Sequence, residues 1–407
     1  HRQVSRLLHL PVDDTMNEIS TQTFQRRNSR ETRFFQTLLE PAGIRFNGSN
    51  EWDITIHDTR LLPRVMSSGT LGLGEAYMDG WWDCEALDQL FERLLSGRID
   101  KRVTAKDPSF LLVLLRAYIL NAQSIKRAFM VGDQHYDISN RLFSLMLDEG
   151  MNYSCGYWKD AKDLNQAQVD KLDLICRKMH LKPGMSVLEI GCGWGGFAKY
   201  AAQNYGVSVH GVTISKEQMR YAEDVCQGLD ISIELKDYRE LNTEYDRIVS
   251  IGMFEHVGYK NYRNYMTVVQ RCLKDDGLFL LHTIGRNNSD RTTEAWINKY
   301  IFPNGMTPSV QQIGKATESL FIIEDWHNIG ADYDPTLMAW YRNFNDAWPE
   351  LKSRYSDRFK RMFDYYLLTS AGSFRARDNQ LWQVVLSAGG IEGGYLADRW
   401  LTAGLNP

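Results

Sequence analysis

Short apolar segments alternate with amphipathic ones from about residue 171 onward, and this alternation restricts the possible folds more than any other feature of the chain. The predicted strands cover 186–190, 207–212, 231–237, 245–252 and 278–285, with later ones at 321–330 and 382–390. Segments between them, such as 215–227 and 262–274, have the apolar spacing of helices. Strands separated by helices predict an α/β, Rossmann-like fold with a doubly wound, mostly parallel sheet.

The length of the chain predicts more than one domain. A chain of 407 residues is too long for one ordinary compact core. Residues 1–98 mix strand-like and helical pieces and predict a small N-terminal α+β domain, in which 44–58 has the Asn-Gly turn and alternation of a β-hairpin. Residues 99–132 are basic and helical in pattern and predict a linker, so that 133–407 would form the large catalytic domain.

Charge and cysteine usage exclude several classes of protein. A formal net charge of −4 argues against nucleic-acid binding, which requires a basic face. The 6 cysteines form no Cys-x-x-Cys pair and are expected to be reduced thiols of a cytosolic protein, and no metal site is expected. The apolar run 110–120 is interrupted by Arg116 and is shorter than the roughly 20 residues of a spanning helix, so we expect no transmembrane segment.

The stretch "VLEIGCGWGGFAKY" reads as a strand, a glycine turn and the start of a helix. Gly191, Cys192 and Gly193 allow a tight turn and the close approach of a ligand. A dinucleotide site would also need an acidic residue at the end of the next strand, and none is present there. Glu189 instead precedes the glycines, which is the pattern of S-adenosylmethionine-dependent methyltransferases. The alternative is that these glycines serve only as a turn.

Polar residues follow the other strands. Thr213 to Gln218 are expected on the ribose side of the cofactor, and Asp237 and Tyr238 on the adenine side.

A second group of polar residues lies in or directly after later segments. It comprises Glu255, His282, Tyr333 and Cys155. Taken singly, His282 reads as a hydrogen-bonded core histidine and Cys155 as an apolar filler. Glu255 is harder to explain this way, because ligands bind at the carboxyl ends of strands in such a sheet. Together the four side chains predict a small polar site that holds an anion or positions a proton acceptor.

Ten segments in order resemble the bacterial cyclopropane-fatty-acyl-phospholipid synthases. They are "LGLGEAYMDGWW", "HYDISN", "YSCGYW", "VLEIGCGWGG", "VTISKEQ", "GMFEHVG", "LLHTIG", "WINKYIFPNG", "DWHNIGADYD" and "SFRARD". The resemblance runs from about residue 40 to about residue 385. It implies methylene transfer from S-adenosylmethionine across the cis double bond of a phospholipid acyl chain.

The resemblance also implies roles for individual residues. Ring closure requires loss of a proton, and family members hold bicarbonate as the base. The cage implied for bicarbonate consists of Glu255, His282, Tyr333, Cys155 and the main chain of Ile284. Tyr153 and Ser154 are implied as cofactor contacts, together with the residues named above at the glycine turn and at the next two strand ends. His256 is expected to support the backbone and not to join the cage.

The resemblance also implies binding partners, and some alternative functions stay open. The resemblance implies surface binding to the phospholipid bilayer at the inner face of the cell membrane through the N-terminal domain, and a homodimer. Family members often carry a cysteine before the "SFRARD" stretch where this chain has Ser370, so covalent catalysis there is excluded. The alternatives are a methyltransferase that makes methyl-branched or methylene lipids or N-methylates an amine, and a lipid-binding scaffold without activity.

Overall fold

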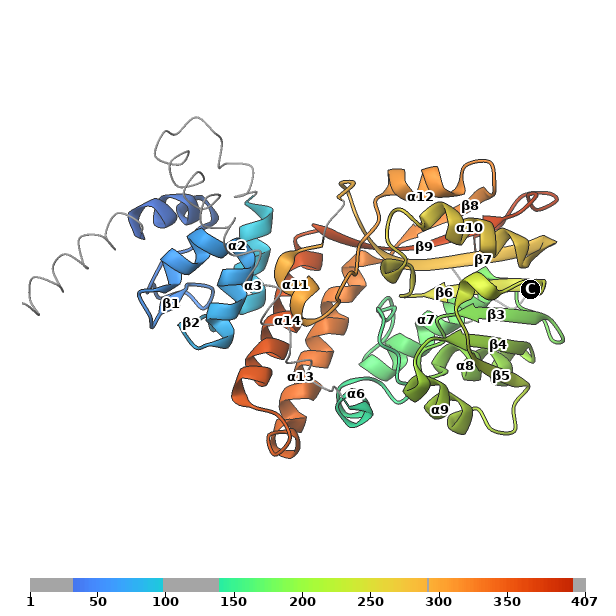
Figure 1. Cartoon of the computed structure of the whole chain (residues 1–407), viewed down its shortest axis with the longest axis horizontal. Coiled ribbons are helices and arrows are strands. Elements are labelled where there is room, and N and C mark those ends of the chain that lie inside the picture. The colour runs from blue at the N-terminus through green and yellow to red at the C-terminus, as the bar shows by residue number, and fades with distance from the viewer. Residues whose placement is uncertain (1–31, 98–138, 291–292, 398–407) are drawn as a thin grey trace, which may run out of the picture.

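A seven-stranded sheet forms the centre of the larger part of the protein (Figure 1). The computed structural model describes residues 32–97, 139–290 and 293–397. The strands are β3 (Ser186–Ile190), β4 (Ser208–Thr213), β5 (Ile231–Leu235), β6 (Tyr245–Ile251), β7 (Leu273–Arg286), β8 (Ile322–Asn328) and β9 (Asn379–Ser387). Their order across the sheet is β5-β4-β3-β6-β7-β9-β8.

The sheet is parallel except at one edge, where β9 pairs antiparallel with both β7 and β8. The predicted doubly wound, mostly parallel sheet is therefore confirmed. After β3 the chain proceeds to β4 and β5 on one side and then returns to place β6 on the other side of β3. Such a reversal of strand order opens a crevice at the carboxyl ends of the strands, where ligands bind in α/β proteins.

Helices cover both faces of the sheet because the buried strands carry apolar side chains on both faces. Val187 of β3 packs in a cluster with α7 (Leu164–Lys178) and α8 (Gly196–Tyr205). The next residue, Leu188, packs on the opposite face with α10 (Tyr262–Arg271) and α12 (Val310–Thr317). Successive side chains of a strand point to opposite faces, so a strand buried on both sides needs an unbroken apolar run. α9 (Lys216–Val225) packs against β4 and β5.

A helical layer lies between the sheet and the N-terminal part of the chain (Figure 1). Its long helices are α13 (Tyr333–Leu351) and α14 (Asp357–Arg375), which pack with α6 (Asn140–Met146) and α11 (Ala295–Tyr300). The N-terminal helices α2 (Leu61–Met78) and α3 (Leu87–Ser96) pack against α14. One hydrophobic core continues from the N-terminal helices into α13 and α14.

The segment 44–58 does not form the predicted hairpin. The two-residue strand β1 (Thr55–Ile56) pairs instead with β2 (Trp82–Asp83), and Phe46 meets Ile54 only at an isolated bridge. The carboxylate of Asp53 is buried and accepts hydrogen bonds from the backbone amides of Arg45 (2.7 Å) and Asn50 (2.9 Å). The loop is therefore wound around this carboxylate, which a pattern of apolar alternation does not reveal.

Four short 3₁₀ helices complete the described structure. They are η1 (Glu40–Ala42), η2 (Tyr238–Glu240), η3 (Phe254–His256) and η4 (Gly330–Asp332). The predicted linker 99–132 lies outside the described residues, and the domain boundary near residue 98 stays a prediction.

Candidate active site

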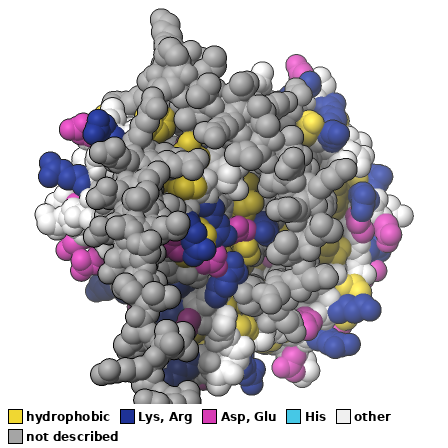
Figure 2. Space-filling model, turned by 60° about the vertical axis from the view of Figure 1, so that its left-hand side comes forward, with side chains coloured by type: hydrophobic (Ala, Val, Ile, Leu, Met, Phe, Trp, Pro, Cys, Tyr) yellow, Lys and Arg dark blue, Asp and Glu magenta, His cyan; other side chains and the backbone are white. Residues whose placement is uncertain are grey.

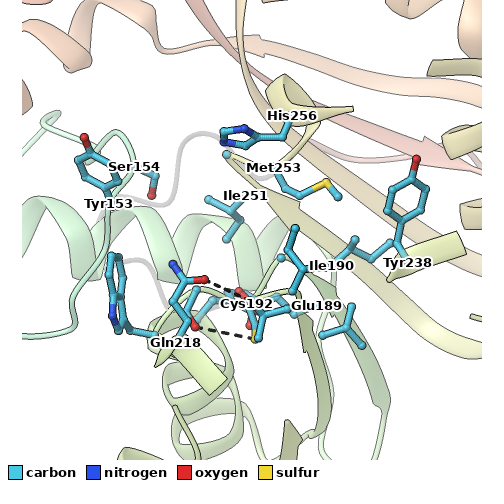
Figure 3. Close-up of a pocket in the computed structure, with 18 of the residues that line it drawn as sticks. Tyr153, Ser154, Glu189, Ile190, Cys192, Gln218, Tyr238, Ile251, Met253 and His256 are labelled. Carbon is cyan, nitrogen blue, oxygen red and sulfur yellow. Dashed lines mark hydrogen bonds between the residues drawn. The ribbon is translucent and has the colours of Figure 1, made fainter. Parts of the chain in front are cut away.

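A cavity of about 550 Å³ lies at the carboxyl ends of β3, β4 and β6 (Figure 3). All ten predicted cofactor residues line it: Tyr153, Ser154, Glu189, Gly191, Cys192, Gly193, Thr213, Gln218, Asp237 and Tyr238. Tyr153 and Ser154 lie on one side of the cavity, and Tyr238 lies on the opposite side. Cavities of several hundred cubic ångströms hold ligands of nucleoside size. The structure therefore brings these residues to one site, and their role as cofactor contacts stays a prediction.

The glycine turn after β3 forms the floor of this cavity. Gly191 has φ 84° and Gly193 has φ 53°, a left-handed conformation that favours glycine. A Cβ atom on Gly191 would lie 2.8 Å from the side chain of Met253, so a side chain at this position would push into the cavity wall. The turn leads directly into the N-terminus of α8, where the partial positive charge of the helix favours electronegative ligand atoms.

Glu189 is buried beside a lysine that the sequence analysis did not single out. Oε2 of Glu189 has no hydrogen-bond partner among the described residues, and burial raises the pKa of this carboxyl to about 8. Lys171 of α7 is fully buried and donates to Oγ of Ser154 at 3.0 Å. Burial lowers the pKa of Lys171 to about 8, although the nearby Asp148, Cys155 and Glu189 favour the charged form of the lysine. No local pattern marks Lys171, because it lies within an ordinary amphipathic helix.

Three further contacts orient the far wall of the cavity. Oγ1 of Thr213 donates to Oε1 of Gln218 at 3.1 Å, which holds the amide group at the start of α9. Asp237 accepts from the backbone amide of Arg239 at 3.0 Å and so caps η2. The ring of Tyr238 packs edge-on against Tyr265. A hydroxyl, an amide and a carboxylate near an aromatic face suit a ribose with its attached base.

A second group of polar residues adjoins the cavity, because Glu255 directly precedes His256 of its lining and His282 pairs with Ile251 in the sheet. Glu255 of η3 is buried, and its Oε1 accepts a hydrogen bond of 2.7 Å from the backbone amide of Ile284. Its other oxygen, Oε2, has no partner among the described residues. Burial raises the pKa of Glu255 to about 7. A carboxylate with one satisfied and one unsatisfied oxygen can accept a proton or a hydrogen bond from a small ligand.

His282 of β7 offers the complementary group. Its ring is 1% exposed, and Nε2 has no partner among the described residues, while Nδ1 lies 3.3 Å from Nε2 of Gln383. Burial, together with the charges of Lys171 and Lys178, lowers the pKa of His282 well below its usual value. A neutral histidine is therefore expected at neutral pH.

Tyr333 and Cys155 border the same group. Cys155 is fully buried and directly follows Ser154 of the cavity wall. Burial raises the pKa of the Tyr333 hydroxyl, and the neighbouring Tyr366, Cys155 and Glu255 raise it further. Burial also raises the pKa of the Cys155 thiol, so Tyr333 and Cys155 are both neutral groups at neutral pH. Glu255, His282 and Ile284, with Tyr333 and Cys155 around them, are called the cage below.

His256 lies at the cofactor cavity. Its side chain lines the cofactor cavity and its ring lies 6.1 Å from that of Phe302. The structure places His256 in the wall of the cofactor cavity (Figure 3), and its expected role in supporting the backbone, outside the cage, stays a prediction.

Comparison with known proteins gives two kinds of match. The family model described as mycolic acid cyclopropane synthetase matches residues 123–384. The cyclopropane-fatty-acyl-phospholipid synthase of Escherichia coli (strain K12) is 56% identical over 369 residues, which cover 90% of this chain and 96% of the relative. A tuberculostearic acid methyltransferase of Mycobacterium tuberculosis is 31% identical over 350 residues, 80% of this chain and 81% of the relative.

Solved structures of cyclopropane synthases also match this chain. The cyclopropane synthase MmaA2 from Mycobacterium tuberculosis is 30% identical with a TM-score of 0.58, over 63% of this chain and 97% of that chain. The mycolic acid cyclopropane synthase CmaA1, solved with SAH and CTAB, is 29% identical with the same TM-score and coverage. Coclaurine N-methyltransferase, at 21% identity and a TM-score of 0.62 over 79% of this chain and 100% of that chain, shares the fold. The predicted methyltransferase fold is confirmed.

Proposed function

This chain belongs to the mycolic acid cyclopropane synthetase family, and we propose that it forms cyclopropane rings on the unsaturated acyl chains of phospholipids. In this reaction the methyl group of S-adenosylmethionine is added to a cis double bond, one proton leaves the added carbon, and the ring closes. The products are the cyclopropane lipid, S-adenosylhomocysteine and a proton. The 56% identity to a synthase of this activity over 90% of the chain supports the assignment of the substrate.

The observation that supports the chemistry most directly is the pair of unpartnered polar atoms in the cage. Oε2 of Glu255 is a buried acceptor, and Nε2 of His282 is a buried ring nitrogen that is available to donate. Buried polar atoms normally have hydrogen-bond partners, so two such atoms beside a cofactor cavity indicate a ligand. Simple methyl transfer to an amine does not need this arrangement, whereas ring closure on an alkene requires a proton acceptor at the reacting carbon.

Bicarbonate fits the cage as that proton acceptor. The ion carries one hydroxyl, which can donate to Glu255, and two further oxygens, which can accept from His282 and Tyr333. The backbone amide of Ile284 holds Glu255 in place through Oε1 and leaves Oε2 for the ion. When bound, bicarbonate supplies a base that is small enough to work beside a buried acyl chain.

The lipid must be met at a membrane surface. Within the described ranges, no helix is both long and apolar enough to cross a bilayer. Figure 2 shows Lys and Arg side chains, with acidic ones among them, in the described part of the face on the N-terminal side. Each basic residue near an anionic bilayer contributes about 1 kcal/mol of attraction. The proposal is peripheral contact with the inner face of the cell membrane, by a homodimer, through the N-terminal domain.

A methyltransferase that leaves a branched methyl or a methylene group on the lipid is the second candidate. It is supported by the 31% identity to the tuberculostearic acid methyltransferase over 80% of the chain. Such enzymes would share the cofactor cavity, and the fate of the added carbon would differ.

Mass spectrometry of acyl chains distinguishes these outcomes. Vesicles of cis-unsaturated or fully saturated phospholipid are incubated with the protein, bicarbonate and S-adenosylmethionine that carries a trideuterated methyl group. A cyclopropane product retains two of the three deuterium atoms, contains no double bond and appears only with the unsaturated lipid. A methyl-branched product that retains all three deuterium atoms and a double bond, or a methylene product that retains two and stays unsaturated, would replace the proposal with the second candidate. Absence of any labelled lipid despite cofactor binding would contradict both.

A further inference from the structure

A row of polar side chains crosses three strands of the sheet behind the cage. His282 of β7 lies directly opposite Gln383 of β9, and Gln383 lies directly opposite His327 of β8. Residues directly opposite each other in antiparallel strands point to the same face of a sheet. The row therefore lies on the same face of the sheet as Leu278 and Leu280, which pack under α7. At the row, hydrogen-bonding side chains take the place of the apolar ones.

Lys178 at the end of α7 covers this row. Its Nζ lies 2.8 Å from Oε1 of Gln383 and 3.0 Å from Nδ1 of His327, and 3.7 Å from a carboxylate oxygen of Asp325. Lys178 and Gln383 are both fully buried. A lysine ammonium group can only donate hydrogen bonds. Oε1 of Gln383 must therefore be the atom that faces the lysine, and this contact determines which way the amide points.

The orientation of the amide determines the tautomer of His282. With Oε1 turned to Lys178, Nε2 of Gln383 lies 3.3 Å from Nδ1 of His282. An amide nitrogen can only donate, so Nδ1 must accept and carries no proton. The proton of the neutral ring is then on Nε2, the atom that has no partner among the described residues.

We propose that Lys178 and Gln383 are positioning residues that hold His282 as an Nε2–H donor directed into the cage. Neither residue is part of the cage, and both act through His282. The consequence for bicarbonate rests on the proposed function, whereas the tautomer of His282 does not. With His282 as donor and Glu255 as acceptor, the cage matches an anion that has both a hydroxyl and negatively charged oxygens. The opposite tautomer would place two acceptors against the anion and weaken its binding.

The substitution Gln383→Glu tests this relay with little change in volume. A carboxylate keeps the contact with Lys178 but replaces the amide donor with an acceptor, so Nδ1 of His282 must now donate. A ring that stays neutral then carries no proton on Nε2. The ring nitrogens are observed by ¹⁵N NMR in protein labelled at its 9 histidines. The signals of His282 are identified by their loss in a His282→Asn variant. We expect the proton on Nε2 in the wild-type protein and on Nδ1 in Q383E.

Kinetics provide the second readout. Replacing a buried donor with an acceptor is expected to raise the KM for bicarbonate in Q383E by about 10- to 100-fold. The KM for S-adenosylmethionine is expected to stay unchanged, because Gln383 does not line that cavity. Gln203→Glu, on the exposed surface of α8, introduces the same charge and serves as the control.

Three results decide the matter. A wild-type His282 that carries its proton on Nδ1, or on both nitrogens at neutral pH, overturns the proposal even if Q383E fails to fold. An unchanged tautomer together with an unchanged KM for bicarbonate in folded Q383E overturns it as well. A protein that shows the expected tautomers in the wild type and in Q383E but makes no cyclopropane lipid would contradict the proposed function and still support the positioning of His282.

Discussion

The backbone amide of Ile284 holds one carboxylate oxygen of Glu255 at 2.7 Å, and the other oxygen of Glu255 is buried without a partner among the described residues. β7 thus supplies both the clamp on Glu255 and, two residues earlier on the same face, the ring of His282. Oε1 therefore holds the side chain in place, and Oε2 is the oxygen that can meet a ligand. The role of Oε2 can be tested by a substitution and by pH.

Replacing Glu255 with glutamine is expected to remove the buried hydrogen-bond acceptor for bicarbonate and keep the shape. The amide oxygen can still accept from Ile284, while the NH₂ group takes the place of the free oxygen. A positioned proton acceptor contributes about 10²- to 10⁴-fold. E255Q no longer holds the bicarbonate that plays this part, so we expect kcat/KM on unsaturated vesicles to fall by that factor. S-adenosylmethionine binding, measured by calorimetry, should not change. Glu223→Gln on exposed α9 is the matched control, and E255Q with control-like activity would refute the role.

The activity is expected to depend on pH through the same carboxyl group. Burial raises the pKa of Glu255 to about 7. The ionised form is needed to accept a hydrogen bond from bicarbonate, so kcat/KM should rise with pH and level off above about 7. The measurement is a pH profile at constant bicarbonate concentration on vesicles of one composition. An acidic limb that lies near the ordinary carboxyl pKa of 4.5 would contradict this assignment.

Stability should show the opposite dependence. Because the folded-state pKa of Glu255 lies above its ordinary value of 4.5, the folded protein binds the proton more tightly than the unfolded chain does. The contribution of Glu255 to stability is therefore fully present below pH 4.5 and is lost as pH rises through about 7. E255Q avoids this loss and should be more stable than the wild type at pH 8, by at most roughly 3 kcal/mol. Urea unfolding at pH 5 and pH 8 measures the difference, and a less stable E255Q at pH 8 would be the contrary result.

Gly191 is expected to be necessary for cofactor binding for two separable reasons. Alanine there is strained at φ 84°, and its Cβ would meet Met253 at 2.8 Å in the cavity wall. Gly228→Ala isolates the first reason, because Gly228 has φ 79° with no atom within 4 Å of an added Cβ. The backbone strain costs roughly 1–2 kcal/mol in both variants. Of the two variants, only G191A should weaken S-adenosylmethionine binding. If the displaced cavity wall costs about 1.4 kcal/mol or more of binding free energy, the affinity falls about 10-fold or more. Equal affinities in the two variants, by calorimetry, would show that Met253 does not matter.

Arg375 is expected to hold the N-terminal helices against the catalytic part. Its guanidinium contacts Asp334 of α13 at 2.8 and 2.9 Å and Asp88 of α3 at 2.7 Å. Arg375→Met leaves two half-buried carboxylates without this partner, which should cost about 1–3 kcal/mol in urea unfolding. Hydrogen exchange should increase in α3. Arg141→Met removes an exposed ion pair with Glu350 and should cost no more than about 0.5 kcal/mol. Equal losses of unfolding free energy in the two variants would contradict the role of Arg375 in holding the N-terminal helices.

Much of the sheet was predictable from the sequence because its strands are short, apolar and separated by helices. The strand predicted at 186–190 is β3 itself, and the one predicted at 245–252 ends one residue beyond β6. β7 begins at Leu273, five residues before the predicted start. The prediction missed this part of the strand because the residues "KDDG" within it are polar. The glycine turn and the polar strand ends then point to one edge of the sheet, where the cofactor cavity lies.

What the sequence by itself determined is therefore the α/β fold, the family and the residues at the strand ends, since these follow from periodicity and contiguous motifs. Only the tertiary structure decided which buried groups support them. Lys178, Gln383 and His282 lie far apart in the chain, and they meet because β9 pairs with β7 in one register and α7 packs over that row. A buried lysine or glutamine is stable only where partners from other elements satisfy it. Such partners depend on strand register and helix packing, which no local pattern of residues encodes.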